Sequence, residues 1–305
     1  MHGDTLPDLK SLQATHGYGV QIKFTTSDVG PAVELNKRGA RAVIALAGAQ
    51  LLSWQPEGQD DAIWLSPDAK PAPGKSLRGG APVCWPWFGA DPEKRGRPAH
   101  GFVRGTPWQV LRTKPTPSDV SITFAFQVTE EHHDLWPHPA RAELTFKLSR
   151  DQLSLDLETL NTGTAPFVLG QALHTYFAVG SIAATEVTGL DGCTYIDTLQ
   201  NWTRHTQQGP VRFDGEVDRI YLDTPDCIEI VDSANARRIA ITARGSRSAV
   251  VWNPWIAKSE RLGDMGPDGY RRMVCVETAN AADDVVTLGP GEAHTLGATY
   301  RIRTS

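Results

Sequence analysis

The sequence of 305 residues predicts an all-β protein, built as a large antiparallel β-sandwich. Several segments alternate apolar and polar residues, and only a β-strand keeps every second side chain on one face. The 28 glycines and 21 prolines are spread along the whole chain, as a fold with many turns requires. No segment of about eleven or more residues shows a convincing helical period.

The expected strands follow one another along the chain. The clearest are 120–128, 142–148 and 153–157, and the last two are separated only by the turn at 149–152. Strands joined in this way form an antiparallel meander. Shorter strands are expected at 41–46, 238–242, 273–276 and 296–302.

The chain shows no internal boundary. No serine-rich or charged linker divides it, and no repeat with a period of about 20–50 residues occurs. We therefore expect residues 21–305 to form a single sandwich domain. Residues 1–20 are expected to form a loosely ordered N-terminal leader.

The charge balance excludes several partners. The sequence has 30 Lys and Arg residues against 35 Asp and Glu residues, and the net charge of −5 opposes bulk attraction to nucleic acid or to an anionic membrane. No apolar stretch approaches the roughly 18 residues that a membrane-spanning helix needs. The four cysteines form no CxxC pair, and no cationic segment followed by an apolar run begins the chain. We expect a cytoplasmic protein with free thiols.

No metal or cofactor is expected. Three histidines cluster in EHHDLWPH at 131–138, but this segment joins two strands, where adjacent histidines are usually solvated. The signatures GxSxG, GxGxxG and HExxH are absent from the sequence. Nucleotide-binding and serine-hydrolase functions therefore have no support.

Residues 78–107 are the segment whose composition is least typical of a purely structural part of the fold. They contain six glycines and five prolines, a composition that leaves no regular element. The same segment carries aromatic side chains that a merely solvated loop would not hold, namely Trp85, Trp87, Phe88 and Phe102. Aromatic faces suit the apolar C–H faces of a sugar ring, so one interpretation is a binding loop. The other is a hydrophobic plug that closes one end of the sandwich.

Arg78 and Arg104 each stand beside a glycine in this segment. Glycine lets the backbone approach a ligand closely, and a guanidinium can hold a pair of anionic oxygens. Together with His100, the two arginines favour a binding loop whose guest is a phosphate or a carboxylate. The alternative for each arginine is a surface charge whose stem covers apolar neighbours.

Two further residues have apolar surroundings. His174 lies in LHTYF, among apolar residues. A histidine there is either a core residue whose ring is hydrogen-bonded or a residue that takes part in function. Glu277 ends the apolar run MVCVE, and a carboxylate at a buried strand end is costly unless it is paired or used. The structural alternative for Glu277 is a salt bridge to Arg271 or Arg272.

Seven segments, taken in order, resemble the aldose 1-epimerase superfamily, specifically its hexose-6-phosphate mutarotase branch. They are LRGGAPVCWPWFG, HGFVRGTPW, ALHTYF, EVDRIY, VVWNPW, DMGPDGYRRMVCVE and LGPGEAHTL, and they span roughly residues 30–303. One such segment is a weak signal, whereas seven in order are a strong one. The resemblance implies a sandwich of the galactose mutarotase type.

The resemblance also implies roles for individual residues. His174 corresponds to the general acid and Glu277 to the general base. The implied substrate-binding residues, with the phosphate held by the two arginines, are Arg78, His100, Arg104, Asp218, Trp87 and Phe88. Ala99 departs from the pattern, because many relatives have glutamine before the histidine of HGF. This departure leaves the substrate preference open.

The implied activity interconverts the α and β anomers of a hexose 6-phosphate, with glucose 6-phosphate as the first expectation. The ring opens and recloses by acid and base catalysis, and no cofactor is needed. A monomer is expected, and an oligomer stays open. Two other functions also stay open: a non-catalytic carbohydrate-binding protein on the same fold, and a mutarotase for unphosphorylated aldoses.

Overall fold

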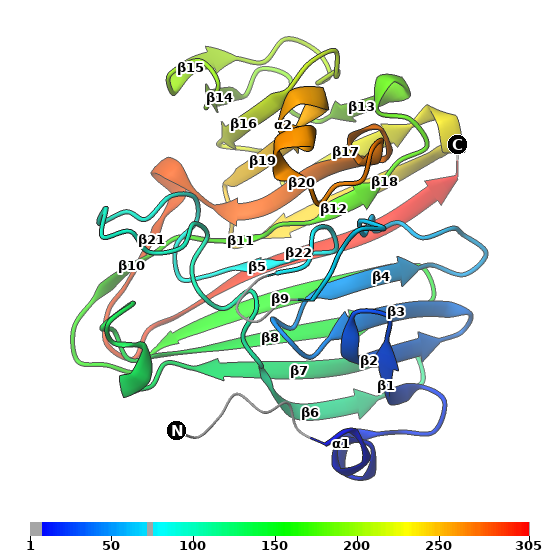
Figure 1. Ribbon diagram of the computed structural model, residues 1–305, viewed down its shortest axis with the longest axis vertical. Helices are drawn as coiled ribbons and strands as arrows, with labels where there is room; N and C mark the ends of the chain where they lie inside the picture. The colour runs from blue at the N-terminus through cyan, green and yellow to red at the C-terminus, as the bar shows by residue number, and fades with distance from the viewer. Residues whose placement is uncertain (1–7, 72–75, 305) are drawn as a thin grey trace.

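The computed structural model describes residues 8–71 and 76–304 (Figure 1). Its strands form two eight-stranded sheets, one four-stranded sheet and one two-stranded sheet. Every pairing between the named strands is antiparallel. The prediction of a large all-β, antiparallel fold is confirmed.

The first eight-stranded sheet, which we call the back sheet, has the order β13-β17-β18-β22-β9-β8-β7-β6. Its strands are β6 (Gln109–Pro115), β7 (Val120–Gln127), β8 (Ala140–Leu148), β9 (Gln152–Asn161), β13 (Thr185–Thr188), β17 (Cys227–Asp232), β18 (Arg237–Arg244) and β22 (Ala293–Thr304). The expected meander corresponds to β7, β8 and β9, which pair as neighbours. Along β8, buried residues alternate strictly with more exposed ones, which is why its period was visible in the sequence.

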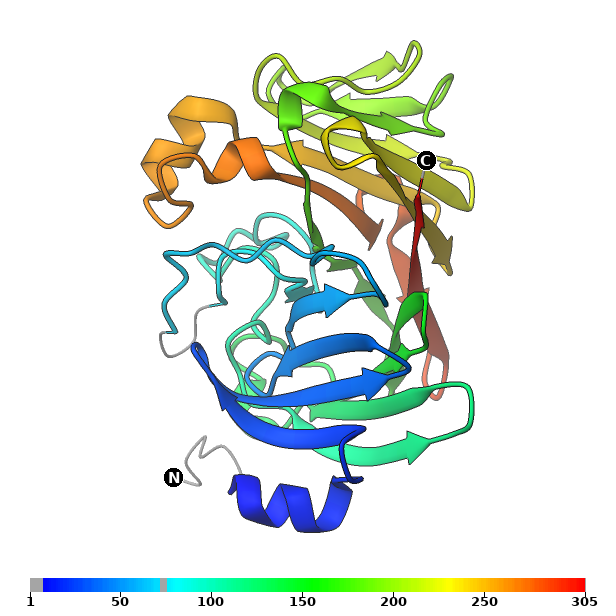
Figure 2. The ribbon, with the colours of Figure 1, turned by 90° about the vertical axis from the view of Figure 1, so that its right-hand side faces the viewer.

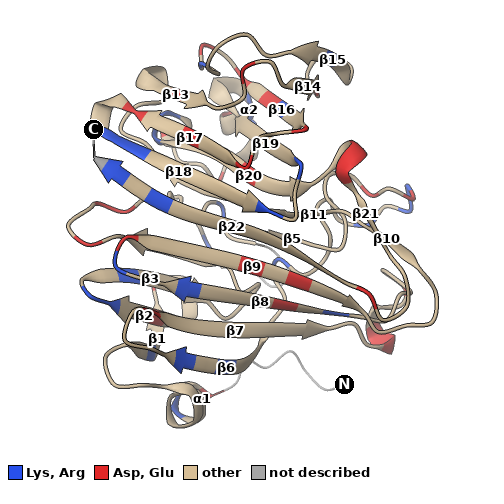
Figure 3. Ribbon diagram, turned by 180° about the vertical axis from the view of Figure 1, so that it is seen from behind, with Lys and Arg blue, Asp and Glu red and all other residues tan. Residues whose placement is uncertain are grey.

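Charged side chains lie along the outer face of the back sheet. Figure 3 shows lysines, arginines and acids on β6, β8, β9 and β22. Some of them pair across neighbouring strands: Arg112 lies 3.1 Å from Glu143, and Arg244 lies 2.7 Å from Asp156. Alternation thus assigns one face of this sheet to solvent and the other to the core.

The second eight-stranded sheet, which we call the front sheet, has the order β15-β14-β16-β19-β20-β11-β5, and β12 also pairs with β20. Its strands are β5 (Val83–Cys84), β11 (Gln171–Leu173), β12 (Tyr176–Ala178), β14 (Thr194–Asp197), β15 (Thr203–Thr206), β16 (Val217–Leu222), β19 (Ser248–Asn253) and β20 (Met273–Asn280). The segment 78–107 is otherwise irregular. β5 corrects the expectation that no regular element forms there, because its two residues pair with β11.

The front sheet is buried on both faces around β20, where all eight residues are buried. Val274 and Val276 belong to the main hydrophobic core that the back sheet also lines, whereas Met273 and Cys275 belong to a second apolar cluster. Successive residues of a strand point to opposite faces, so β20 serves two layers. The face of the second cluster is the one that carries the site described below.

The remaining elements include a four-stranded sheet, which shares the main hydrophobic core with the back sheet (Figure 2). They are β1 (Ile22–Ser27), β2 (Gly30–Lys37), β3 (Ala40–Ala45) and β4 (Leu51–Gln55) of the four-stranded sheet, β10 (Phe167–Leu169) and β21 (Val286–Leu288) of the two-stranded sheet, and the helices α1 (Leu9–His16) and α2 (Trp255–Leu262). The four shorter strands expected from the sequence correspond to β3, β18, β20 and β22. Within the described residues, no helix is long and apolar enough to cross a membrane.

Part of the expected leader forms α1, and residues 1–7 of that leader lie outside the described residues. Asp8 caps the helix by accepting a hydrogen bond from the backbone N–H of Ser11 at 3.2 Å. Leu12 is buried in the main core. The side-chain oxygen of Gln13 accepts a hydrogen bond from the backbone N–H of Phe24 at 2.8 Å. These contacts join α1 to β1.

Candidate active site

His174 and Glu277 face each other because of strand register. β12 pairs with β20 so that Tyr176 lies opposite Cys275. β11 pairs with β20 in the same register. Two residues along from Tyr176 and Cys275, in opposite chain directions, this register places His174 opposite Glu277. Two residues far apart in the sequence thus meet on one face of the front sheet.

The His174–Glu277 pair is almost closed to solvent. Nδ1 of His174 lies 3.4 Å from Oε1 of Glu277, and the two residues are 9% and 2% exposed. Their approach is not aligned as a hydrogen bond. Among the described residues, neither Nδ1 nor the second carboxylate oxygen Oε2 has a hydrogen-bond partner. Buried polar atoms without partners are costly, and they point to a ligand that supplies the missing contacts.

Burial shifts the pKa values of the two groups in opposite directions. It lowers the pKa of His174 well below 6.5, and the surrounding positive charge, which includes Arg104 and Arg78, lowers it further. Burial raises the pKa of Glu277 well above 4.5, and the negative charge of Asp218 adds to this rise. The imidazolium is therefore a stronger acid, and the carboxylate a stronger base, than the free side chains.

A row of side chains beside this pair crosses four strands of the front sheet. It runs, in order, through Tyr176, Cys275, Trp252 and Asp218. The ring of Tyr176 lies parallel to the imidazole of His174, with centroids 4.9 Å apart and planes inclined by 7°. Trp252 meets both of these rings edge-on. The aromatic rings fix the plane of the imidazole and give the site an apolar wall.

Asp218 brings an acid to the end of this row. The ammonium of Lys258, on α2, lies 3.4 Å from the carboxylate of Asp218 and 2.9 Å from that of Glu216. Burial raises the pKa of Asp218, and the charge of Lys258 opposes this rise. A carboxylate held in this way can accept hydrogen bonds from the hydroxyl groups of a sugar.

The loop that follows β5 contributes His100 and Phe88. The backbone of His100 is left-handed, with φ of 65°, and its N–H donates to the Gly89 carbonyl at 2.7 Å. The ring of His100 lies 4.9 Å from that of Phe88 and 5.8 Å from that of His174, measured between centroids. Its Nδ1 accepts the N–H of Gly89 at 3.3 Å, which leaves the ring proton on Nε2. Burial, together with the nearby arginine charges, lowers the pKa of His100 to about 3.

Arg78 and Arg104 bring positive charge to this group. Nε of Arg78 donates to the carboxylate of Asp264 at 2.9 Å, and its Nη1 donates to the hydroxyl of Tyr176 at 3.1 Å. Nη2 of Arg104 donates to a backbone carbonyl of its own loop at 2.9 Å. Within the described residues, Arg104 has no acidic partner at ion-pair distance. Two cationic groups with N–H donors to spare suit a phosphate.

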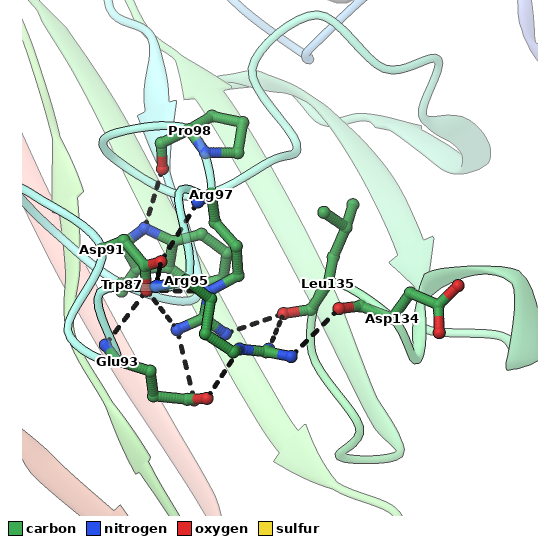
Figure 4. A network of polar contacts seen from close by, with 8 residues as sticks. All are labelled: Trp87, Asp91, Glu93, Arg95, Arg97, Pro98, Asp134 and Leu135. Atoms are coloured by element: carbon green, nitrogen blue, oxygen red, sulfur yellow. Dashed lines mark hydrogen bonds and ion pairs between the residues drawn. The ribbon is translucent and has the colours of Figure 1, made fainter.

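Trp87 is placed apart from these residues. Its side chain is buried, its indole N–H donates to the Pro98 carbonyl at 3.0 Å, and the guanidinium of Arg97 lies 4.4 Å above its ring. Figure 4 shows the indole inside a network in which Arg97 bonds to Asp91 and to the carbonyl of Leu135. These contacts hold the loop against the segment around Leu135. None of them reaches His174 or Glu277.

One group among the described residues has the spacing of a metal site. Ligand atoms of His174, Cys275 and Glu277 lie within 4.8 Å of one another. Burial, with the charge of Glu277, raises the pKa of the Cys275 thiol well above 9.0, so in the absence of a metal this thiol stays protonated. The two arginine charges also oppose a cation here. We interpret the group as an acid and base pair beside a buried thiol.

The sequence had not assigned Tyr176, Trp252, Asp264 or Lys258 to the site. Tyr176 carried a usable signal, because it lies two residues from His174 and a strand returns to the same face at every second residue. Trp252 occupies a motif to which the resemblance gave no role. Asp264 likewise begins one of the seven segments that carry the resemblance, without a role assigned to it. Lys258 carried no signal, because its acidic partners lie on a distant segment of the chain.

Several surface hollows lie away from these residues. One of about 720 Å³, beside α1, is lined by Gln13, Gly19, Val20, Lys23, Phe24 and Asn36. Its lining contains no histidine, cysteine or carboxylate, so it offers no groups for acid and base chemistry. The residues around His174 and Glu277 are therefore the candidate active site.

Known proteins resemble this chain over most of its length. Residues 31–301 match the family described as Aldose 1-epimerase. A protein of Escherichia coli (strain K12) named "Putative glucose-6-phosphate 1-epimerase" is 40% identical over 255 residues, which cover 83% of this chain and 84% of that protein. The crystal structure of a "putative mutarotase" from Salmonella typhimurium has a TM-score of 0.88 and 32% identity, and the match covers 97% of this chain and 99% of that one. A galactose mutarotase related enzyme from Lactobacillus acidophilus shares the fold, with a TM-score of 0.72 at 16% identity over 90% of this chain and 97% of that one.

Proposed function

The chain belongs to the aldose 1-epimerase family, and from this premise we propose that it interconverts the α and β anomers of a hexose 6-phosphate. Glucose 6-phosphate is the substrate we put first. The observation that carries the proposal is the buried His174–Glu277 pair, which has unpartnered polar atoms and lies beside two arginines.

The mechanism assigns one proton transfer to each member of the pair. Glu277 takes the proton of the C1 hydroxyl, C1 and its oxygen form the aldehyde, and the bond from C1 to the ring oxygen breaks. His174 gives its proton to the ring oxygen as that bond breaks. Rotation about C1–C2 followed by the reverse transfers yields the other anomer.

The shifted pKa values support this assignment. A depressed pKa makes the protonated His174 a ready donor, and a raised pKa makes Glu277 a ready acceptor. The negative charge of a bound phosphate would offset the nearby arginines and so favour the protonated imidazole before each turnover. Substrate binding then offsets the part of the shift that the arginines cause, while burial remains the larger cause.

Arg78 and Arg104 are assigned to the phosphate. Asp264 holds one side of the Arg78 guanidinium, and the loop backbone holds one nitrogen of Arg104, so both groups keep N–H donors for a ligand. His100 and Asp218 are assigned to sugar hydroxyls, and Phe88, which packs on His100, lines the site. Trp87 supports the loop in this assignment.

Two other functions are less well supported. A non-catalytic carbohydrate-binding protein has no need for a buried acid and base pair with opposed pKa shifts. A mutarotase for unphosphorylated aldoses has no need for two arginines beside that pair. Names given to relatives also favour the phosphorylated sugar, since the Escherichia coli protein bears the name of a glucose-6-phosphate 1-epimerase.

Anomer exchange of glucose 6-phosphate, followed by NMR magnetisation transfer, tests the proposal. The protein should accelerate this exchange well above the spontaneous rate and should act far less efficiently on glucose. Acceleration on glucose alone would transfer the proposal to unphosphorylated aldoses. The absence of acceleration on both sugars would favour the binding protein.

Two further proposals concern the setting. We place the protein in the cytoplasm, in keeping with its four free cysteines, of which Cys84 and Cys275 are buried. We also propose that it works as a monomer, because one chain supplies every residue of the candidate site.

A further inference from the structure

The ring of Tyr176 is buried and packs against three other aromatic rings. The residue is 2% exposed and begins β12, directly beside the edge of the site. Trp64 stacks on its ring at 5.9 Å, His174 lies parallel to it at 4.9 Å, and Trp252 meets it edge-on at 5.8 Å. With three aromatic neighbours, the ring has a single position.

The hydroxyl of Tyr176 makes a separate contact. It accepts a hydrogen bond from Nη1 of Arg78 at 3.1 Å, while Asp264 accepts from Nε of the same guanidinium at 2.9 Å. Burial raises the pKa of Tyr176, so the hydroxyl stays neutral and keeps its lone pairs for Arg78. Two partners fix the plane of the guanidinium, and its Nη2 edge is left for a ligand.

We propose that Tyr176 is a positioning residue that couples phosphate binding to proton transfer, because its hydroxyl orients Arg78 while its ring orients His174. This inference rests on the function proposed above. A phosphate gripped by Arg78 is set at a fixed place relative to Tyr176, and the imidazole stacked on Tyr176 is set relative to the same ring. The sugar between them is then held at the distance that the proton transfer requires.

A tyrosine that served only to fill the core would need its ring and not its hydroxyl. The two roles therefore separate in two variants. Tyr176→Phe keeps the stack on His174 and removes the bond to Arg78. Tyr176→Leu removes both the stack and the bond. Tyr270→Phe is the matched control, because Tyr270 is also buried and its hydroxyl accepts a hydrogen bond from Nε of Arg271 at 3.0 Å, outside the site.

The decisive measurements are the kinetics of anomer exchange on glucose 6-phosphate and on glucose, with the Kd of glucose 6-phosphate from calorimetry. For Tyr176→Phe we expect KM and Kd for glucose 6-phosphate to rise about 10-fold, as loss of a hydrogen bond to a charged group predicts. We also expect kcat on glucose 6-phosphate to fall, because the phosphate no longer sets the distance between the sugar and His174, while the kinetics on glucose stay within about twofold. Tyr176→Leu should lower kcat on both sugars by at least about 10-fold. Tyr270→Phe should match the wild type.

A double variant tests the coupling itself. If the hydroxyl acts through Arg78, Tyr176→Phe should add no further loss in a background that already carries Arg78→Ala. Additive losses, equal losses of Tyr176→Phe on both sugars, or a silent Tyr176→Phe would each overturn the positioning role. The Kd measurement reports on the link between Tyr176 and Arg78 even if the wild type shows no catalysis, so failure of the proposed function is recognised separately.

Discussion

Arg104 is the arginine of the site whose charge is least compensated. Among the described residues, the Arg104 side chain donates one hydrogen bond, to a backbone carbonyl, whereas Arg78 is paired with Asp264. A charge-assisted bond to phosphate contributes about 1.5–3 kcal/mol. We therefore expect Arg104→Ala to lower kcat/KM for glucose 6-phosphate roughly 10- to 100-fold.

The control for this prediction is glucose, which carries no phosphate. Its kcat/KM should change by less than about threefold in Arg104→Ala. Equal losses on the two sugars would show that Arg104 holds the loop together, and its assignment to the phosphate would be withdrawn.

His100 makes stability depend on pH in a defined direction. Its pKa is about 3 in the folded protein and 6.5 in an unfolded chain. Above pH 6.5 neither state is charged, and between pH 6.5 and 3 the unfolded chain binds a proton that the folded protein does not. Stability is therefore full above pH 6.5 and falls as the pH drops, by at most about 1.4 kcal/mol per pH unit for this one proton.

Urea unfolding at several pH values, on the wild type and on His100→Asn, measures this contribution. Asparagine tolerates the left-handed backbone at position 100, and its side-chain oxygen can accept the N–H of Gly89. The variant should lose stability less steeply toward acid, by up to one proton's worth of slope. His174 is present in both proteins and contributes to both slopes. Identical slopes would therefore mean that the pKa of His100 is the same in the folded protein and in the unfolded chain.

Single residues also show how far sequence reasoning reached into the site. The sequence predicted a role for His174 and Glu277 through their motifs, and the register of β11 and β12 with β20 places them opposite each other. The pairing of Arg78 with Asp264 could not be predicted, because the two residues lie 186 positions apart and no local pattern links them. Trp87 and Phe88 are neighbours in sequence, yet their ring contacts differ, since only Phe88 meets His100.

Among the elements, the strands were easier to predict than the helices. β8 alternates at each position, and burial on one face explains the pattern. The helices α1 and α2 have eight residues each, too few for a helical period to stand out from the surrounding chain. β5 has only two residues, and it forms because β11 offers an edge beside it.

The loop after β5 contains a glycine, Gly101, where there is no room for a side chain. Gly101 has φ of +77°, and a Cβ there would lie 1.8 Å from the carbonyl oxygen of Trp85. Gly96, in the same loop, has φ of +82° and no atom within 4 Å of such a Cβ. Gly96→Ala should cost about 1–2 kcal/mol of unfolding free energy, and Gly101→Ala about 2 kcal/mol more.

Chemical denaturation of the two alanine variants tests this prediction. Because Gly101 follows His100, we also expect Gly101→Ala to lose activity on glucose 6-phosphate, with Gly96→Ala close to the wild type. Equal stability of the two variants would show that the loop relaxes around the added methyl group.

At the scale of the whole molecule, two arginines bring positive charge to the site of a protein whose net charge is negative. The net charge is −5, yet Arg78 and Arg104 both lower the pKa values of His100 and His174. An anionic substrate is therefore attracted by the site and not by the protein as a whole. The same arrangement opposes a divalent cation beside the acid and base pair.

Metal removal is the test of that last point. Dialysis against a strong chelator should leave the rate of anomer exchange within about twofold of the untreated protein, because the proposed mechanism moves protons between side chains and sugar without a metal. Polarimetry before and after dialysis measures the rate. A large loss that one divalent ion restores would make His174, Cys275 and Glu277 a metal centre.

The central claim is that His174 and Glu277 transfer the protons of anomer exchange. Anomer exchange of glucose 6-phosphate in His174→Asn and Glu277→Gln, measured by NMR alongside circular dichroism to confirm folding, tests it most directly. Each replacement keeps a similar shape and removes the ability to give or take a proton, so we expect each to lower kcat about 10²- to 10⁴-fold. Near-full activity in either folded variant would contradict the account.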